Sequence, residues 1–249
     1  MDETPASVTE DHVLGGKVTL RQPAKGYRAG LDAALLAAAC DAGPGEVVLD
    51  AGCGVGAVML AAAVRRPGAR FVGVERDAAT LALARANIAA NGLADRVDAA
   101  GGDLGAPDAR CETRFDAALS NPPFFDDPAA LRGPHPTKQA AFIAEAGLAA
   151  WTGYLLRAVR EGGTITVIHR ADRLADLFAS LAAKAGSFQI RPVHPYTDEP
   201  AGRVLVRAVR GGRAPLRLLP ALVLHERGGA KHSPEAEAIL RGEADLPWL

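Results

Sequence analysis

Two short segments of the sequence carry residue types whose spacing suits chemistry on a bound small molecule. They are LDAGCGVG at residues 49–56 and SNPPFF at residues 120–125, and each includes or follows a short apolar run. In the first, a glycine-rich turn between a strand and a helix lets a ligand approach the backbone, and the unpaired N–H groups of the helix start face that ligand. In the second, two prolines stiffen the backbone and end the strand before them.

The glycine-rich segment admits two ligands. Gly52, Gly54 and Ala57 fit the G-x-G-x-x-G/A pattern that binds the pyrophosphate of a dinucleotide such as NAD. Asp50, at the end of the strand, would repel a pyrophosphate and attract a cation. S-adenosylmethionine (SAM) carries an α-amino group and a sulfonium, so the charge of Asp50 favours SAM over NAD. A glycine turn without any ligand is the third interpretation.

Acidic residues end two further predicted strands, and their placement indicates that the ligand contains a nucleoside. Glu75 ends the run Phe71–Glu75, where an acid typically accepts hydrogen bonds from ribose hydroxyls in NAD and SAM proteins alike. Asp103 follows two glycines and would receive the adenine amino group. Taken alone, an aspartate in such a place is more often a turn or cap residue.

The segment SNPPFF indicates the acceptor. An amino group attached to a ring or a carbonyl is a poor nucleophile, because its lone pair is delocalised. The side-chain oxygen of Asn121 and the carbonyl of Pro122 would accept hydrogen bonds from its N–H groups and aim the lone pair at a methyl group. Phe124 would stack on a flat acceptor, a contact worth about 1–3 kcal/mol. We expect Phe125 in the core; a proline loop before two core phenylalanines is the alternative.

Short apolar runs alternate with helical patterns from about residue 46 onward, which predicts a parallel sheet covered by helices on both faces. The predicted strands are 46–50, 71–75, 96–100, 115–119, 164–168, 188–193 and 203–209. The predicted helices are 57–66, 77–91, 138–160 and 174–185, with one more starting near Leu31 and a short one started by Ser233 and Pro234. The last strand alternates charged and apolar residues, as a strand with one face in water would.

The net charge of −1 excludes a strongly basic protein and leaves nucleic-acid contacts to local patches. A candidate phosphate-binding rim consists of Lys17, Arg21, Lys25, Arg28, Arg203, Arg207, Arg210, Arg213 and Arg217. The three cysteines and the histidines lack the spacing of a disulfide framework or a metal site, so we expect no metal. The acidic start MDETPASVTEDHV is no signal peptide, and no apolar run approaches the roughly 20 residues that cross a membrane. We expect a soluble cytoplasmic protein with a short disordered N-terminal lead.

The segments LDAGCGVG, GVE, GGD and SNPPFF, in this order and spacing, resemble the class I SAM-dependent methyltransferases with an NPP(Y/F) motif. This group acts on adenine N6 or guanine N2 of nucleic acids, or on glutamine N5 of proteins. The flanking segments RQPAKGYRAGLDAALLAA and HSPEAEAILRG resemble the bacterial tRNA1(Val) adenine-N6 methyltransferases, which modify the adenine beside the anticodon. Phe124 stands where many members have tyrosine, which keeps the stacking face but removes a hydroxyl.

The resemblance implies the class I fold, a Rossmann-like, mostly parallel sheet of seven strands with helices on both faces. A lead-in with a lid-like segment would span residues 1–43, the methyltransferase domain residues 44–211, and a C-terminal extension on the same domain residues 212–249. The implied reaction moves a methyl group from SAM to the N6 amine of an adenine flipped out of tRNA. We expect a monomer that does not bind membranes.

The site residues follow from the motifs and the resemblance together. Those expected to bind SAM are Asp50, Gly52, Gly54, Glu75, Asp103 and Asp32; those expected at the reacting amine are Asn121, Pro122 and Phe124; those expected to bind the substrate are Tyr27, Arg28 and Pro123. Asp32 has an alternative role as the cap of a helix beginning at Ala33. The rival functions are transfer to a guanine of rRNA or to a protein glutamine, an NAD-dependent oxidoreductase, and a nucleoside-binding module without catalysis.

Overall fold

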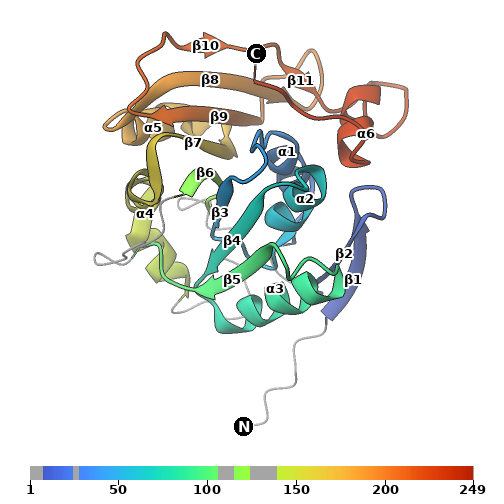
Figure 1. Cartoon of the computed structure of the whole chain (residues 1–249). Coiled ribbons are helices and arrows are strands. Elements are labelled where there is room, and N and C mark those ends of the chain that lie inside the picture. Colours follow the sequence, from blue (N-terminus) through green and yellow to red (C-terminus); the bar gives the residue numbers. More distant parts are fainter. Residues whose placement is uncertain (1–7, 25–27, 106–114, 124–138, 249) are drawn as a thin grey trace.

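A computed structural model describes residues 8–24, 28–105, 115–123 and 139–248. The described residues contain a central sheet of nine strands in the order β10-β8-β9-β7-β6-β3-β4-β5, with β11 also paired to β8 (Figure 1). Its strands are β3 (Val47–Ala51), β4 (Arg70–Glu75), β5 (Val97–Gly101), β6 (Phe115–Ser120), β7 (Val159–Arg170), β8 (Ala185–His194), β9 (Arg203–Arg210), β10 (Arg217–Leu218) and β11 (Leu222–Val223). All pairings are parallel except those of β9. The seven predicted strands are confirmed, and two very short ones extend the sheet beside β8.

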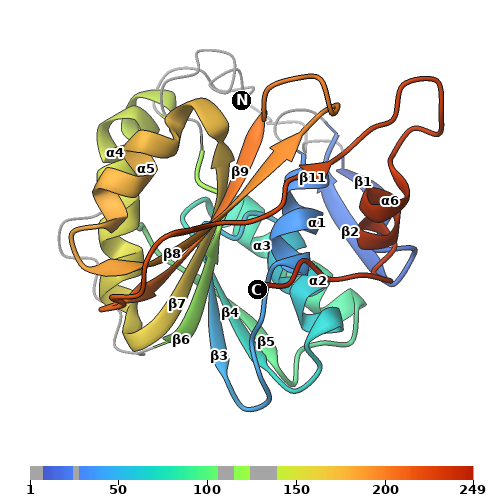
Figure 2. The ribbon, with the colours of Figure 1, turned by 90° about the horizontal axis from the view of Figure 1, so that it is seen from above.

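Helices cover both faces of this sheet, as predicted (Figure 2). They are α1 (Leu31–Ala38), α2 (Ala57–Arg65), α3 (Ala78–Ala90), α4 (Gln139–Ala158), α5 (Leu174–Leu181) and α6 (Pro234–Leu240). One core cluster joins α1, α2 and α3 to the sheet through residues such as Leu36, Leu60 and Phe71. The other lies under α4 and α5 around Leu155 and Leu177. Burial on both faces explains why the strands read as nearly continuous apolar runs.

Two element predictions in the second half of the chain are wrong. The single long helix expected over residues 138–160 is broken at Gly147, whose φ of 58° and ψ of 161° are not helical, and it ends at Ala158. Strand β7 then begins at Val159 and contains Gly162 and Gly163. A Cβ on Gly163 would lie 2.6 Å from the carbonyl oxygen of Asp116, so this glycine serves a close approach between strands rather than a helix end. Strand β9 does not leave one whole face in water, because Leu205, which shares a face with Arg203 and Arg207, is fully buried.

Residues 8–13 of the N-terminal lead form a strand, which corrects the disorder expected for them. Strand β1 (Val8–Val13) pairs antiparallel with β2 (Val18–Pro23), and the turn between them holds Leu14, Gly15 and Gly16 at positive φ. Strand β1 is acidic and half exposed, so its own sequence predicts little burial. Its order comes from pairing with β2, whose Val18 and Leu20 are fully buried.

Two asparagines, Asn87 within α3 and Asn91 at its C-terminal cap, hold the outer backbone of β2. Asn91 exchanges hydrogen bonds with the N–H and C=O of Thr19, at 2.9 and 2.7 Å. Asn87 does the same for Arg21, at 2.8 and 2.9 Å, and its Nδ2 also donates to the carbonyl of Val55, at 2.9 Å. Each side-chain amide thus makes the pair of hydrogen bonds that the backbone of a neighbouring strand would make to β2. Asn87, which is fully buried, links the hairpin to the glycine-rich turn.

The C-terminal part begins its helix as predicted, since Ser233 caps α6 by accepting from the N–H of Ala236 at 3.2 Å. The end of α6 packs on the hairpin turn: a Cβ on Gly15 would lie 2.9 Å from the carbonyl oxygen of Arg241. The N-terminal and C-terminal segments therefore meet on the face of the sheet that carries α1 and α2. None of the helices in the described ranges is long and apolar enough to cross a bilayer.

Candidate active site

Most of the predicted site residues lie at one edge of the sheet. Asp50, Glu75, Asp103 and Asn121 end or follow β3, β4, β5 and β6, and these four parallel strands are neighbours in the order β6-β3-β4-β5. The chain proceeds to one side of β3 through β4 and β5 and to the other side through β6 and β7. Open α/β sheets bind ligands outside the carboxyl ends of their strands at such a switch point.

The glycine-rich turn is anchored by the acid that precedes it. Gly52, Gly54 and Gly56 all have positive φ, and Gly56, at the cap position of α2, has no side chain to accept from the helix N–H groups. Asp50 supplies that acceptor, because its Oδ2 accepts from the N–H of Met59 at 3.0 Å. Its exposed fraction is 1%, and burial raises its pKa to about 7. The sequence did not predict that Asp50 caps α2.

Glu75 joins two turns at the same edge. Its Oε2 accepts from the N–H of Gly54 at 3.0 Å and its Oε1 from the N–H of Asp77 at 2.8 Å. The carboxylate thus lies against the glycine-rich turn, where the sequence predicts a ribose. Asp103 accepts from the N–H of Gly105 at 2.9 Å and lies 3.7 Å from Arg76. Asp103 therefore has the turn role that competes with adenine binding, and its contact with adenine stays a prediction.

Trp151 of α4 is part of the site and was missed from the sequence. Its Nε1 donates to the hydroxyl of Ser120 at 2.8 Å, and that hydroxyl donates to the carbonyl of Ala51 at 2.9 Å. Its indole covers Gly52, where an added Cβ would lie 2.5 Å from Cζ2. The tryptophan therefore packs between the two motifs. Only the fold brings it there, since α4 begins well after SNPPFF in the chain.

Gly52→Ala and Gly54→Ala should show how much of the stability of the turn depends on its packing against Trp151. Alanine at residue 52 meets the indole as well as a positive φ, which should lower the free energy of unfolding by about 2–5 kcal/mol. Gly54 has nothing within 4 Å of an added Cβ, so alanine there should cost only about 1–2 kcal/mol of backbone strain. Urea unfolding of the two variants measures this difference; equal losses would contradict the packing of Trp151 on Gly52.

Asn87→Ala should loosen the glycine-rich turn as well as the hairpin. It leaves the backbone of Arg21 and the carbonyl of Val55 without their partner, a loss of about 2–4 kcal/mol in the free energy of unfolding. Asn91→Ala is the matched control, because it releases β2 at Thr19 and makes no bond to the turn. Calorimetric titration with SAM should show weaker binding for Asn87→Ala alone.

Several predicted site residues are placed elsewhere or not described. Tyr27 and Phe124 lie outside the described residues, as do Lys25 and Phe125. Asp32 is not a helix cap, because α1 begins at Leu31 after Gly30; it pairs instead with Arg203, Oδ2 to Nε, at 3.0 Å. Arg28 pairs with Asp11 of the hairpin at 2.6 Å. The binding roles of these residues stay predictions.

The arginines of β9 that were predicted to join the basic rim do not gather at one edge of the sheet. Strand β9 is antiparallel to β7, so its seven steps from Arg203 to Arg210 carry the chain about 23 Å toward the opposite edge of the sheet. Acids also pair with these cations: Arg207 with Asp41 at 2.9 Å and Arg210 with Glu161 at 3.5 Å. Within the described ranges, no group of three or more His, Cys, Asp or Glu side chains is placed to hold a metal ion.

Comparisons with known proteins agree with this geometry. Residues 28–150 match the family model described as the methyltransferase small domain. The tRNA1(Val) (adenine(37)-N6)-methyltransferase of Porphyromonas gingivalis is 40% identical over 107 residues, which are 39% of this chain and only 41% of that protein. The protein of the same name from Dyadobacter fermentans is 27% identical over 234 residues, which are 92% of this chain and 95% of that protein.

Among solved structures, a predicted O-methyltransferase from Agrobacterium tumefaciens superposes with a TM-score of 0.71 at 24% identity, covering 86% of this chain and 98% of that one. This likeness establishes the fold, and the match over residues 28–150 contains both the glycine-rich turn and SNPPFF. Residues 28–150 therefore resemble the methyltransferase small domain, and the chain has the fold of class I methyltransferases.

Proposed function

We propose that the protein transfers a methyl group from SAM to the exocyclic N6 amine of an adenine in tRNA. One observation carries the proposal: Asn121-Pro122-Pro123 follows β6, the direct neighbour of β3 and its glycine-rich turn. Adjacent strands lie about 4.8 Å apart, so a methyl donor on the turn and an amine at Asn121 fall within reach of each other. The full-length likeness to a relative named as an adenine-N6 tRNA methyltransferase supports this acceptor.

The residues at the carboxyl edge fit SAM better than a dinucleotide. A buried acid, Asp50, stands beside the turn, and a second acid, Glu75, accepts from the N–H of Gly54 in the turn. Two carboxylates oppose a pyrophosphate, whereas they suit an α-ammonium group and a ribose diol. When bound, SAM supplies a methyl group on an electron-poor sulfur. Nothing lies within 4 Å of an added Cβ on Gly54, which leaves space beside the turn for a ligand.

In the proposed reaction the protein positions the amine rather than activating it with a base. The oxygen of Asn121 and the carbonyl of Pro122 accept from the two N–H groups, so the nitrogen lone pair is directed toward the methyl carbon. A C–N bond forms as the C–S bond breaks, and the proton of the methylated nitrogen then leaves to water. Ser120 fixes the start of this segment, because its hydroxyl is bonded to Ala51 and Trp151.

The acceptor is most sharply defined by the names of the relatives, which specify adenine 37 of tRNA1(Val). We propose the same acceptor here, reached by extruding the base from the loop. We also propose that the protein works as a monomer in the cytoplasm, where tRNA is available.

Labelled SAM tests this function directly. The protein is incubated with methyl-labelled SAM and bulk tRNA that lacks the modification, and the RNA is digested to nucleosides. We expect the label in N6-methyladenosine. Label in N2-methylguanosine, or in no nucleoside, would refute the adenine acceptor. Parallel calorimetric titrations with SAM and NAD test the cofactor, and preferential binding of NAD would overturn it.

A further inference from the structure

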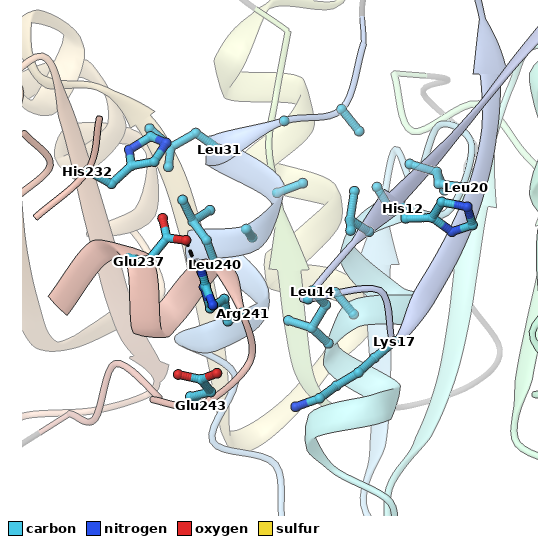
Figure 3. Close-up of a pocket in the computed structure, with 18 of the residues that line it drawn as sticks. His12, Leu14, Lys17, Leu20, Leu31, His232, Glu237, Leu240, Arg241 and Glu243 are labelled. Atoms are coloured by element: carbon cyan, nitrogen blue, oxygen red, sulfur yellow. Dashed lines mark hydrogen bonds and ion pairs between the residues drawn. The ribbon is translucent and has the colours of Figure 1, made fainter. Parts of the chain in front are cut away.

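A groove outside the proposed methyl-transfer site runs between the hairpin β1–β2 and helix α6 (Figure 3). It encloses about 700 Å³, within the range of about 300–1,000 Å³ of small-ligand sites. Figure 3 shows His12 and Leu20 on the hairpin side and Leu240 and Arg241 on the α6 side, with helix α1, which begins at Leu31, between them. The two chain ends thus form one cleft.

The position of the groove links it to the methyl-transfer edge. Leu31 begins α1, and the chain passes from the end of α1 to the amino end of β3. The start of α1 therefore lies toward the carboxyl ends of the strands. Ala57, the first residue of α2 after the glycine-rich turn, also lines the groove. The far end is bridged by Lys17, whose Nζ donates to the carbonyl of Gly242 at 3.1 Å. A chain leaving the acceptor pocket across α1 would therefore enter the groove.

One wall ends in a stack of planar side chains. The ring of His232 lines the groove and stacks on His225, with centroids 5.2 Å apart and planes 28° apart. The ring centroids of His225 and Tyr196 lie 5.5 Å apart, and the guanidinium of Arg227 lies 4.4 Å from the centre of the Tyr196 ring. Asp198 and Glu199 hold Arg227 at 3.2 and 2.8 Å. Three planar groups, from two loops, thus stand behind the ring that lines the groove.

The polar groups of the groove suit a polyanion with flat substituents. Its cations are Lys17, Lys231 and Arg241, and its acids are Glu237 and Glu243. Arg241 is paired with Glu237 at 2.7 Å, which leaves two lysines against one acid. The buried Nδ1 of His232 has no hydrogen-bond partner in the described parts of the chain. Burial also lowers the pKa of His232, which favours its neutral form.

We propose that this groove binds an unpaired nucleotide of the RNA, next to the one that is methylated. The base lies on the apolar floor and stacks against His232, while the lysines meet the backbone phosphates. Aromatic stacking combined with cations is how proteins hold single-stranded RNA without reading its sequence. This inference rests on the proposed RNA substrate and adds a second contact surface to it.

Binding of unmodified tRNA without SAM tests the groove separately from methyl transfer. Fluorescence anisotropy should show roughly 5- to 150-fold weaker binding for His232→Ala, the range expected for one lost stacking contact. His232→Phe keeps a planar ring and should bind within about threefold of the wild type. Calorimetric SAM affinity should be equal for all three proteins, because the substituted ring is not in the cofactor site.

A charge pair provides the matched control. Lys231→Glu reverses a cation at the groove, and Lys184→Glu makes the same change just before β8, at the opposite edge of the sheet. Only Lys231→Glu should weaken tRNA binding and flatten the slope of log affinity against log salt, by roughly 0.7 for one lost phosphate contact. If both groove variants bind tRNA like the wild type, the groove is not an RNA site and the proposed function stands. If the wild type binds no tRNA, both proposals fail.

Discussion

Asn121→Ala is expected to lose methyl transfer while keeping its affinity for SAM. Removing the oxygen that holds the amine leaves the lone pair undirected, and losses of one positioning or charge-stabilising group typically lower kcat by about 10²–10³-fold. SAM affinity should stay within about twofold, because the cofactor residues follow other strands. Single-turnover transfer to tRNA and calorimetric SAM titration measure the two effects.

Two further variants make this result specific. Asn121→Asp keeps an acceptor oxygen in nearly the same place and should retain more activity than Asn121→Ala. Asn121→Gln moves the oxygen by one methylene and should be almost as impaired, because a displacement of about 1 Å can cost about 100-fold in rate. Thermal unfolding of each variant controls for folding. Unchanged transfer in Asn121→Ala would refute the role of Asn121 at the amine.

The parts of the site that the sequence predicted are those that follow from local chain order. The acids that end β3, β4 and β5 and the segment after β6 meet because parallel strands bring their carboxyl ends to one edge. The cap at Ser233 is likewise a local signal, and the structure confirms it. For such residues, knowing the element and its end is enough to know the position.

The parts that were missed depend on pairings between distant segments. Strand β1 is acidic and half exposed, and it becomes a strand only by pairing with β2. Trp151 packs against Gly52, which lies about a hundred residues earlier in the chain. No pattern in the sequence of α4 shows that the face of the helix carrying Trp151 is turned toward Gly52. The clustered arginines of β9 suggested one surface, but the antiparallel direction of that strand spreads them and acids from other elements pair with them.

The affinity for SAM should fall about tenfold between pH 8 and pH 6, and Asp50→Asn should remove this dependence. In the free protein burial raises the pKa of Asp50 to about 7, so the group is half protonated near neutral pH. A cationic ligand beside it favours the ionised form, so binding releases a proton wherever the free protein holds one. The ligand's own titration affects both proteins, and the ratio of their affinities isolates Asp50.

The contribution of the same carboxyl group to the stability of the free protein changes with pH in the direction opposite to the SAM affinity. Its folded-state pKa lies above the unfolded value of 3.8, so its contribution to the free energy of unfolding is fully present below pH 3.8 and is lost as the pH rises through 7. The full loss is on the order of 4 kcal/mol. As the pH rises from 5 to 8, Asp50→Asn should therefore become more stable in urea unfolding relative to the wild type. Over the same range its constant affinity for SAM should fall further below the rising affinity of the wild type.

These two opposite effects distinguish a cofactor carboxylate from a helix anchor. If Asp50 serves only to accept from the N–H of Met59, the amide oxygen of asparagine replaces it and SAM affinity stays equal to that of the wild type at every pH. If it also meets the cation, the buried charge is a cost in the free protein that the ligand removes. A stabilised variant with weak, pH-independent SAM binding would assign both roles to the one residue.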